Sequence, residues 1–149
     1  MNKHHHDMRT FIFITLLFLT TSAFGQCKSF TKNTCRPMLE DFVPNENFNS
    51  TMLVPGDEAE LKLTFYGGQE YRLLVCGHPV LGELEFTVMD KKKNELFKRS
   101  ADNPDAFFDF RPESTQQILV KVNVPMRENP NELIHEGCVS IMVGYRETN

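Results

Sequence analysis

An alternation of apolar and polar side chains, with a period of two residues, runs through most of this chain after residue 50. It is clearest at residues 58–65, where Ala59, Leu61, Leu63 and Phe65 alternate with Glu58, Glu60, Lys62 and Thr64. A period of two places one set of side chains in a core and the other in water, as in a strand at the surface of a sheet. The chain is therefore expected to fold mainly into strands.

The same pattern predicts about eight strands. Besides 58–65, they cover residues 70–76, 84–89, 96–97, 106–110, 118–124 and 138–145, with a weaker one near 51–54. The runs 70–76 and 138–145 are apolar on both faces, which is typical of a strand at the centre of a sheet. Only residues 37–42 (PMLEDF) suggest a turn of helix. Many short strands around one core predict an all-β fold, a single antiparallel β-sandwich.

Short breaks separate the predicted strands. Residues 54–57 (VPGD) are typical of a type II turn, in which Gly56 takes the positive φ angle. The pair Gly67-Gly68 predicts a hairpin between strands 58–65 and 70–76. Residues 90–94 (DKKKN) predict the tip of a second hairpin, where the three lysines are expected to be solvated.

The first 25 residues are predicted to be a signal peptide that is removed on export. Lys3 and Arg9 give a positive start, residues 11–19 (FIFITLLFL) form a short apolar run, and Ala23-Phe24-Gly25 is a small-x-small cleavage site. The run is shorter than the roughly 20 apolar residues that span a bilayer. A lipid anchor at Cys27 is the alternative, although Gln26 is not the small residue that such a signal requires.

The expected mature chain covers residues 26–149 and forms one domain, with a cysteine-containing segment at 26–47. It is predicted to be exported, to the periplasm, the cell surface or the medium, and to lack a transmembrane segment. Without the leader it carries 14 basic and 19 acidic side chains, a net charge of −5. Nucleic-acid binding requires clustered lysine and arginine and is not expected.

Four cysteines lie in the mature chain, and an even number in an exported domain predicts disulfides. Cys27 and Cys35 flank a short polar segment, while Cys76 and Cys138 lie at the ends of two predicted central strands. Of the three pairings, Cys27–Cys35 with Cys76–Cys138 is the one we predict. As an alternative, Cys76, His78, His135 and Cys138 supply the two Cys and two His of a structural zinc site.

Familiar catalytic patterns are absent from the sequence: there is no H-E-x-x-H, no G-x-S-x-G and no Walker glycine loop. If the cysteines are bonded, no thiolate nucleophile remains. His78 and His135, the histidines of the mature chain, are expected on surface loops. No enzymatic activity and no cofactor are therefore expected, and a small hydrolase is the least favoured function.

Two ligand sites remain as alternatives. Asp102, Asp105 and Asp109 offer carboxylate oxygens within one loop, as calcium requires, although such sequences are common in turns. A carbohydrate surface relies on exposed aromatic rings. The chain has no tryptophan, which disfavours such a surface, but Tyr66 is predicted on the wet face of its strand.

Residues 55–124 resemble the bacterial pre-peptidase C-terminal domain in pattern. The segments in question are ELKLTFYGGQEYRLLV, LEFTVMDKKKNELF, FFDFRP and QQILVKVNV. The segments QCKSFTKNTC and YRLLVCG are also similar to those of small secreted proteins of Gram-negative bacteria. The resemblance implies a jelly-roll-like sandwich, an accessory to secreted enzymes with occasional calcium or polysaccharide contacts.

The expected function is that of a non-enzymatic exported interaction or accessory module. Its partner would be an unknown protein or a cell-surface component. A ligand-binding module for glycan or calcium is the alternative.

Overall fold

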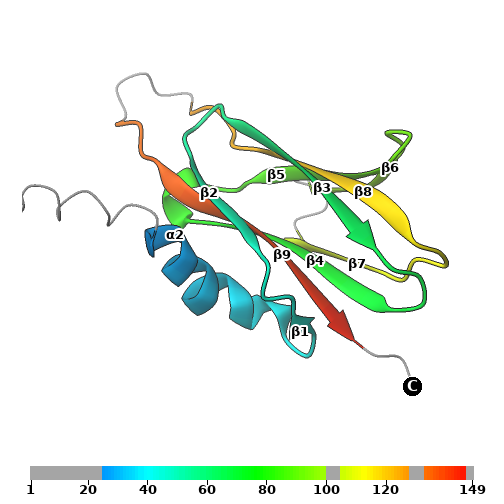
Figure 1. Cartoon of the computed structure of the whole chain (residues 1–149). Coiled ribbons are helices and arrows are strands. Elements are labelled where there is room, and N and C mark those ends of the chain that lie inside the picture. Colours follow the sequence, from blue (N-terminus) through cyan, green and yellow to red (C-terminus); the bar gives the residue numbers. More distant parts are fainter. Residues whose placement is uncertain (1–24, 100–104, 128–132, 147–149) are drawn as a thin grey trace, which may run out of the picture.

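Two antiparallel sheets pack face to face in the computed structural model, which describes residues 25–99, 105–127 and 133–146 (Figure 1). Sheet A contains β1 (Val43–Pro44), β2 (Asn49–Leu53), β4 (Glu70–Gly77), β7 (Phe107–Phe110) and β9 (Gly137–Arg146). Sheet B contains β3 (Glu58–Phe65), β5 (Glu85–Asp90), β6 (Glu95–Arg99) and β8 (Gln116–Asn123). The predicted all-β sandwich is confirmed.

The strands follow the order β2-β9-β4-β7 in sheet A, with β1 on the far end of β9, and β3-β8-β5-β6 in sheet B. From β2 onward the chain changes sheet at every connection except β5–β6. Apart from the short β1, each sheet has four strands, and two four-stranded sheets joined in this way form a jelly roll. The exception, β5–β6, is the hairpin predicted at the lysine-rich tip, and this prediction is confirmed.

The predicted hairpin between residues 58–65 and 70–76 is wrong, because β3 pairs with β8 and β4 pairs with β7 and β9. The two glycines instead form a corner between the sheets. The Gly68 N–H donates to the Pro112 carbonyl at 2.9 Å, and a Cβ on Gly67 would lie 2.7 Å from the Glu113 carbonyl oxygen. A glycine pair thus shows that the chain turns, but not which strand it pairs with next.

The type II turn at residues 54–57 is confirmed and also links the two sheets. Gly56 has φ 93°, and the Asp57 N–H donates to the Val54 carbonyl at 3.0 Å. Between the sheets lies the main core, to which both contribute their inward side chains. Its fully buried members include Leu73 of β4, Phe86 and Val88 of β5, and Ile118, Val120 and Val122 of β8.

The outer face of sheet A is covered by a helical segment at residues 25–39 (Figure 1). It consists of α2 (Gly25–Phe30), the π-helical η1 (Thr31–Cys35) and the 3₁₀-helical η2 (Arg36–Leu39). Cys35, Leu39 and the following Phe42 form a second small core with Leu74, Cys76 and Met142 of the sheet. This is why β4 and β9 are apolar on both faces, and their predicted central position is confirmed.

All four cysteines are in disulfides, as predicted, but the predicted pairing is wrong. The bonds are Cys27–Cys138, to β9, and Cys35–Cys76, to β4. Because residues 27–35 are helical, eight residues separate Cys27 from Cys35 by roughly 12 Å along the helix axis. A disulfide requires Cα atoms about 4.4–6.8 Å apart, so these two cysteines reach the sheet and not each other.

Thr31 lies between the two disulfides and is fully buried. Its hydroxyl donates to the Cys27 carbonyl at 2.7 Å and lies 2.5 Å from the Ser140 hydroxyl of β9. Ser50 of β2 completes this polar group, at 3.3 Å from Ser140. The helical segment therefore meets the sheet through two disulfides with a hydrogen-bonded hydroxyl group between them.

Arg72 of β4 lies at the other end of the interface between the helical segment and sheet A. Its guanidinium pairs with both carboxylate oxygens of Asp109, each at 2.8 Å, and with Glu40 at 2.8 Å. It also lies over the rings of Phe42 and Phe107, at 4.7 and 4.0 Å from their centroids. The hydrogen bond with Asp109 first, and then that with Glu40, together with the charges of both carboxylates, hold the pKa of Arg72 above its usual value against the opposing effect of burial.

The predicted leader lies outside the described residues, except for Gly25. No helix among the described residues is long and apolar enough to span a bilayer. Cys27, the residue of the lipid-anchor alternative, has its sulfur bonded to Cys138.

Candidate functional site

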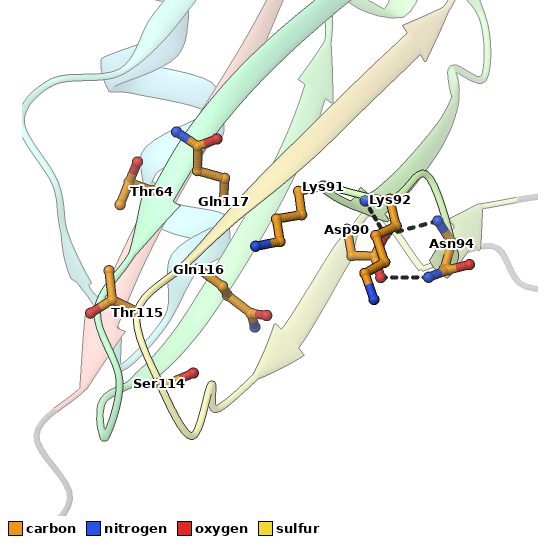
Figure 2. Close-up of a pocket in the computed structure, with 9 residues that line it drawn as sticks. All are labelled: Thr64, Asp90, Lys91, Lys92, Asn94, Ser114, Thr115, Gln116 and Gln117. Carbon is orange, nitrogen blue, oxygen red and sulfur yellow. Dashed lines mark hydrogen bonds between the residues drawn. The ribbon is translucent and has the colours of Figure 1, made fainter.

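A polar pocket of about 570 Å³ lies at the end of the sandwich where the β5–β6 hairpin tip faces the β7–β8 connection (Figure 2). It is lined by Thr64 of β3, by Asp90, Lys91, Lys92 and Asn94 of the tip, and by Ser114, Thr115, Gln116 and Gln117. All nine side chains are polar. In Figure 2 the Lys91 side chain extends from the tip toward β8, which carries Gln116 and Gln117.

Asp90 organises the hairpin tip through its carboxylate. Oδ1 accepts hydrogen bonds from the backbone N–H of Lys92 at 2.7 Å and of Asn94 at 2.9 Å, and Oδ2 accepts from Asn94 Nδ2 at 2.7 Å. The Asn94 side chain, followed by these backbone donors, holds the pKa of Asp90 below its usual value. Asp90 is therefore an ionised structural group, unsuited to accept a proton at neutral pH.

Lys93 at the same tip has a left-handed backbone conformation, with φ 66°. Glycine or asparagine is usual at such a position, because other side chains are strained there. Lys93 lines a neighbouring hollow of about 290 Å³ on the outer face of sheet B, together with Lys62 and Glu60. Three consecutive lysines thus surround one tip, with a fourth close by on β3.

The side chains that line the pocket are suited to binding a ligand. Two ammonium groups, three hydroxyls and three side-chain amides can hold an anionic group by charge and hydrogen bonds. Within the described part of the chain, no histidine lines the pocket to activate a hydroxyl as a nucleophile. His78 follows β4 and His135 precedes β9, so the antiparallel register places both at the opposite end of the sandwich.

The zinc alternative is wrong, because Cys76 and Cys138 are bonded to Cys35 and Cys27. His78 is exposed, as predicted, and its Nδ1 accepts a hydrogen bond from Val80 N–H at 3.2 Å, capping the short helix η3 (Pro79–Leu81). His135 is exposed on the β8–β9 connection, also as predicted.

The calcium alternative is not assembled in the part of the chain that is described. Asp102 lies outside that part, and Asp105 is exposed. Both carboxylate oxygens of Asp109 accept hydrogen bonds from Arg72. Within residues 25–99, 105–127 and 133–146, no group of three or more His, Cys, Asp or Glu side chains is placed to hold a metal.

A second candidate surface, apolar in character, lies at the end opposite the pocket. Met126, Leu133 and Ile134 of the β8–β9 connection are 74%, 75% and 76% exposed. The side chain of Arg127 donates to the Val80 carbonyl and holds the start of this connection against η3. Exposed apolar side chains of this size are typical of contact surfaces. The two ends of the sandwich therefore offer partners different chemistry.

Sequence reasoning identified the lysine tip but not the pocket beside it. Thr64, Ser114, Thr115, Gln116 and Gln117 come from segments that the tip meets only after folding. Taken alone, each is an ordinary polar residue of a wet strand face or a turn. Tyr66, the predicted carbohydrate contact, is 66% exposed but is not among the residues that line the pocket.

No protein-family model matches the sequence, and no curated protein is significantly similar to it. Among solved structures, the chain is similar to PliG of Aeromonas hydrophila, a periplasmic inhibitor of g-type lysozyme. The two are 12% identical with a TM-score of 0.48, over 72% of this chain and 90% of that one. A de novo designed double-stranded β-helix gives 13% identity and a TM-score of 0.32, over 67% and 99%. Neither similarity identifies a function for this chain.

Proposed function

We propose that this chain is an exported, non-enzymatic module that binds an acidic segment of a protein partner in the lysine-lined pocket. The observation that carries the proposal is that the Asp90 carboxylate already accepts hydrogen bonds within its own hairpin tip. Asp90, the only carboxylate among the described residues that line the pocket, is fully engaged with its own hairpin tip, and Lys91 and Lys92 lie beside it. A partner's carboxylates would meet two ammonium groups together with hydroxyl and amide donors.

The distribution of charge supports an acidic ligand. The predicted mature chain has a net charge of −5, yet lysines gather at this end of sheet B. A local positive site on an acidic surface steers an acidic partner to one place and repels it elsewhere. Lys93 adds to this argument, because the tip keeps a lysine where glycine would relieve backbone strain.

Export is supported by the two disulfides, since such bonds persist in oxidising compartments. They also remove the thiols that a cysteine nucleophile would need. The described residues that line the pocket include no aromatic ring, which disfavours a neutral sugar as the ligand because sugars stack on exposed rings. Glycan binding at Tyr66 remains the alternative.

The test is a titration of the isotopically labelled protein with a hexaglutamate peptide, followed by amide chemical shifts. Shifts are expected at Thr64, Asn94, Gln116 and Gln117, and they should weaken as salt is raised. The double variant Lys91→Gln/Lys92→Gln should abolish them. The matched control Lys28→Gln/Lys32→Gln removes two exposed lysines from the helical segment and should leave them unchanged.

The proposal is wrong if the shifts follow every exposed lysine equally, or if hexaglutamate produces none. Parallel titrations with chitohexaose and with a sulfated hexasaccharide separate the glycan alternative. Saturable binding of either sugar, without binding of hexaglutamate, would assign the module to carbohydrate.

A further inference from the structure

The edge of sheet B formed by β3 is open. Among the described residues, β3 pairs with β8 on one side and with no strand on the other, and it lies at the side of the sandwich where β2 is its neighbour (Figure 1). Its eight residues contain no proline, and its register with β8 has no bulge. Proteins usually shorten, bend or cover such an edge, because its unpaired backbone groups can bind another strand.

The inward face of β3 is only partly covered. Ala59, Leu61 and Leu63 point toward the core but are half-buried. Between β3 and β2 runs a groove of about 220 Å³, whose lining includes the core residues Val122, Val139 and Ile141. A strand added to the β3 edge would therefore gain apolar contacts as well as backbone hydrogen bonds.

The backbone direction shows which residues face outward. The Asp57 carbonyl accepts a hydrogen bond from Val124 N–H at 2.9 Å, on the β8 side. Because these groups alternate along a strand, the odd-numbered residues of β3 bond to β8. The N–H and carbonyl groups of Glu58, Glu60, Lys62 and Thr64 then point to the open edge.

We propose that this edge pairs with the β3 edge of a second copy of the chain, antiparallel, about a two-fold axis at Leu61. Pairing residues across that axis sets Glu60 opposite Lys62, Ala59 opposite Leu63 and Glu58 opposite Thr64. The two copies of sheet B become one continuous sheet of eight strands. Thr64 belongs both to this edge and to the pocket lining, but the pairing uses its backbone groups and not its side chain, so the dimer does not depend on the proposed function.

The charged side chains of β3 favour a second copy of the chain as the partner of this edge, and they also favour one register for the pairing. Neither Glu60 nor Lys62 forms an ion pair within the part of the chain that is described. An axis at Leu61 gives two Glu60–Lys62 pairs and no like-charge pair. An axis at Glu60 sets Glu60 against Glu60, and its two opposite-charge pairs would use Glu58, which already pairs with Lys121. An axis at Lys62 sets Lys62 against Lys62. A shift by a single residue would turn the apolar face of one copy to water. Cross-strand ion pairs of this kind are favourable, and like charges in the same places are unfavourable.

The experiment measures the association of the full chain by sedimentation. Wild type is expected to dimerise, and Lys62→Glu or Glu60→Lys should each weaken dimerisation roughly tenfold or more, because each sets like charges opposite one another. The double swap Glu60→Lys/Lys62→Glu restores opposite charges across the axis and should restore the dimer. Lys28→Glu, an equal change of charge on α2, serves as the control and should leave it unchanged.

Amide hydrogen exchange gives a second readout that does not depend on variants. With rising protein concentration, the N–H groups of Glu58, Glu60, Lys62 and Thr64 should gain protection, while those of Leu61 and Leu63, already bonded to β8, should not.

A chain that stays monomeric at millimolar concentration overturns the proposal, as does a dimer that the single variants leave intact. Outward N–H groups that are protected independently of concentration would also overturn it, since another segment of the same chain would then occupy the edge.

Discussion

The two sheets differ in what covers their outer faces. Sheet A lies between the main core and the helical segment, so β4 and most of β9 are buried on both sides. Sheet B has the core on one side only, and β3 is exposed at every second residue. Both disulfides, the buried hydroxyl group at Thr31 and the Arg72 cluster belong to sheet A.

This difference separates stability from recognition. The disulfides and buried polar contacts hold the helical segment against the outer face of sheet A. The lysine-lined pocket and the open β3 edge, in contrast, lie on sheet B. Binding surfaces can vary without loss of the fold where few buried contacts depend on them. Changes on the outer face of sheet A should therefore be costly for stability, and equivalent changes on the outer face of sheet B should be nearly neutral.

The largest effect is expected from Cys35→Ala/Cys76→Ala, which removes the bond between the helical segment and β4. Loss of a native disulfide from a small domain typically lowers the free energy of unfolding by about 2–5 kcal/mol. The bond joins residues 41 positions apart, so the unfolded chain gains much conformational freedom. Denaturant unfolding of the purified variant measures the change. A loss below about 1 kcal/mol would mean that packing alone holds the segment.

A smaller effect is expected from Arg72→Met, which replaces the guanidinium that lies over the rings of Phe42 and Phe107 by an uncharged, apolar side chain. Asp109 and Glu40 lose their partner, and the expected loss is about 1–3 kcal/mol, limited because both carboxylates reach solvent. The matched change on sheet B is Lys121→Met, which removes the 3.0 Å pair with Glu58 between two partly exposed side chains. There we expect less than about 0.5 kcal/mol. Equal losses would contradict the contrast between the sheets.

The covered face of sheet A could be predicted from sequence only in part. The apolar pattern of β4 and β9 predicted burial on both sides, but not what covers them. The sequence predicts only a turn of helix at residues 37–42, which overlaps η2. The rest of the helical segment is not predictable from propensity, because Ser29, Thr31 and Asn33 are poor helix formers and Pro37 follows closely. Two disulfides and the burial of Thr31 stabilise it there. Helix propensity does not take these tertiary contacts into account. Without the helix, Cys27 and Cys35 can be expected to lie close together, which is why the predicted cysteine pairs are wrong.

The strands themselves were predictable because a period of two depends on the neighbouring residues alone. Their partners were not, since in a jelly roll consecutive strands join opposite sheets and the same turn residues serve hairpins and corners alike. The pocket has the same limitation. Lys91 and Lys92 are conspicuous in the sequence, whereas Thr64 and Gln117 become part of a site only through strand order.

Paired threonine variants give a finer comparison of the sheets. Thr31→Val keeps the shape of the side chain but removes the buried hydroxyl that contacts Cys27 and Ser140. We expect a loss of about 1–2 kcal/mol, since Ser140 keeps only the longer contact with Ser50. Thr64→Val, on the exposed face of β3, should change stability by less than about 0.5 kcal/mol. Thermal unfolding of both variants is the measurement, and a neutral Thr31→Val would show that the hydroxyl group contributes nothing.

The smallest effect is expected at the hairpin tip of sheet B, where Asp90 is stabilised by local bonds alone. The folded tip lowers the pKa of Asp90, so the stability that the carboxylate contributes is present above its unfolded pKa and disappears as pH falls through the folded value. Asn94→Ala removes the donor at 2.7 Å, the largest cause of the shift, and should raise the Asp90 pKa part of the way to its ordinary value. Carbon NMR of the Asp90 carboxyl group follows the titration directly, with Asn33→Ala on η1 as a control that should not alter it. Among the described residues the tip shares no hydrogen bond or ion pair with the helical segment, so the resonances of Thr31 and of its partner Ser140 should stay unchanged through the same titration. If these resonances shift together with that of Asp90, the two sheets are coupled. The contrast between a covered sheet A that provides stability and an exposed sheet B that provides binding surfaces would then be wrong.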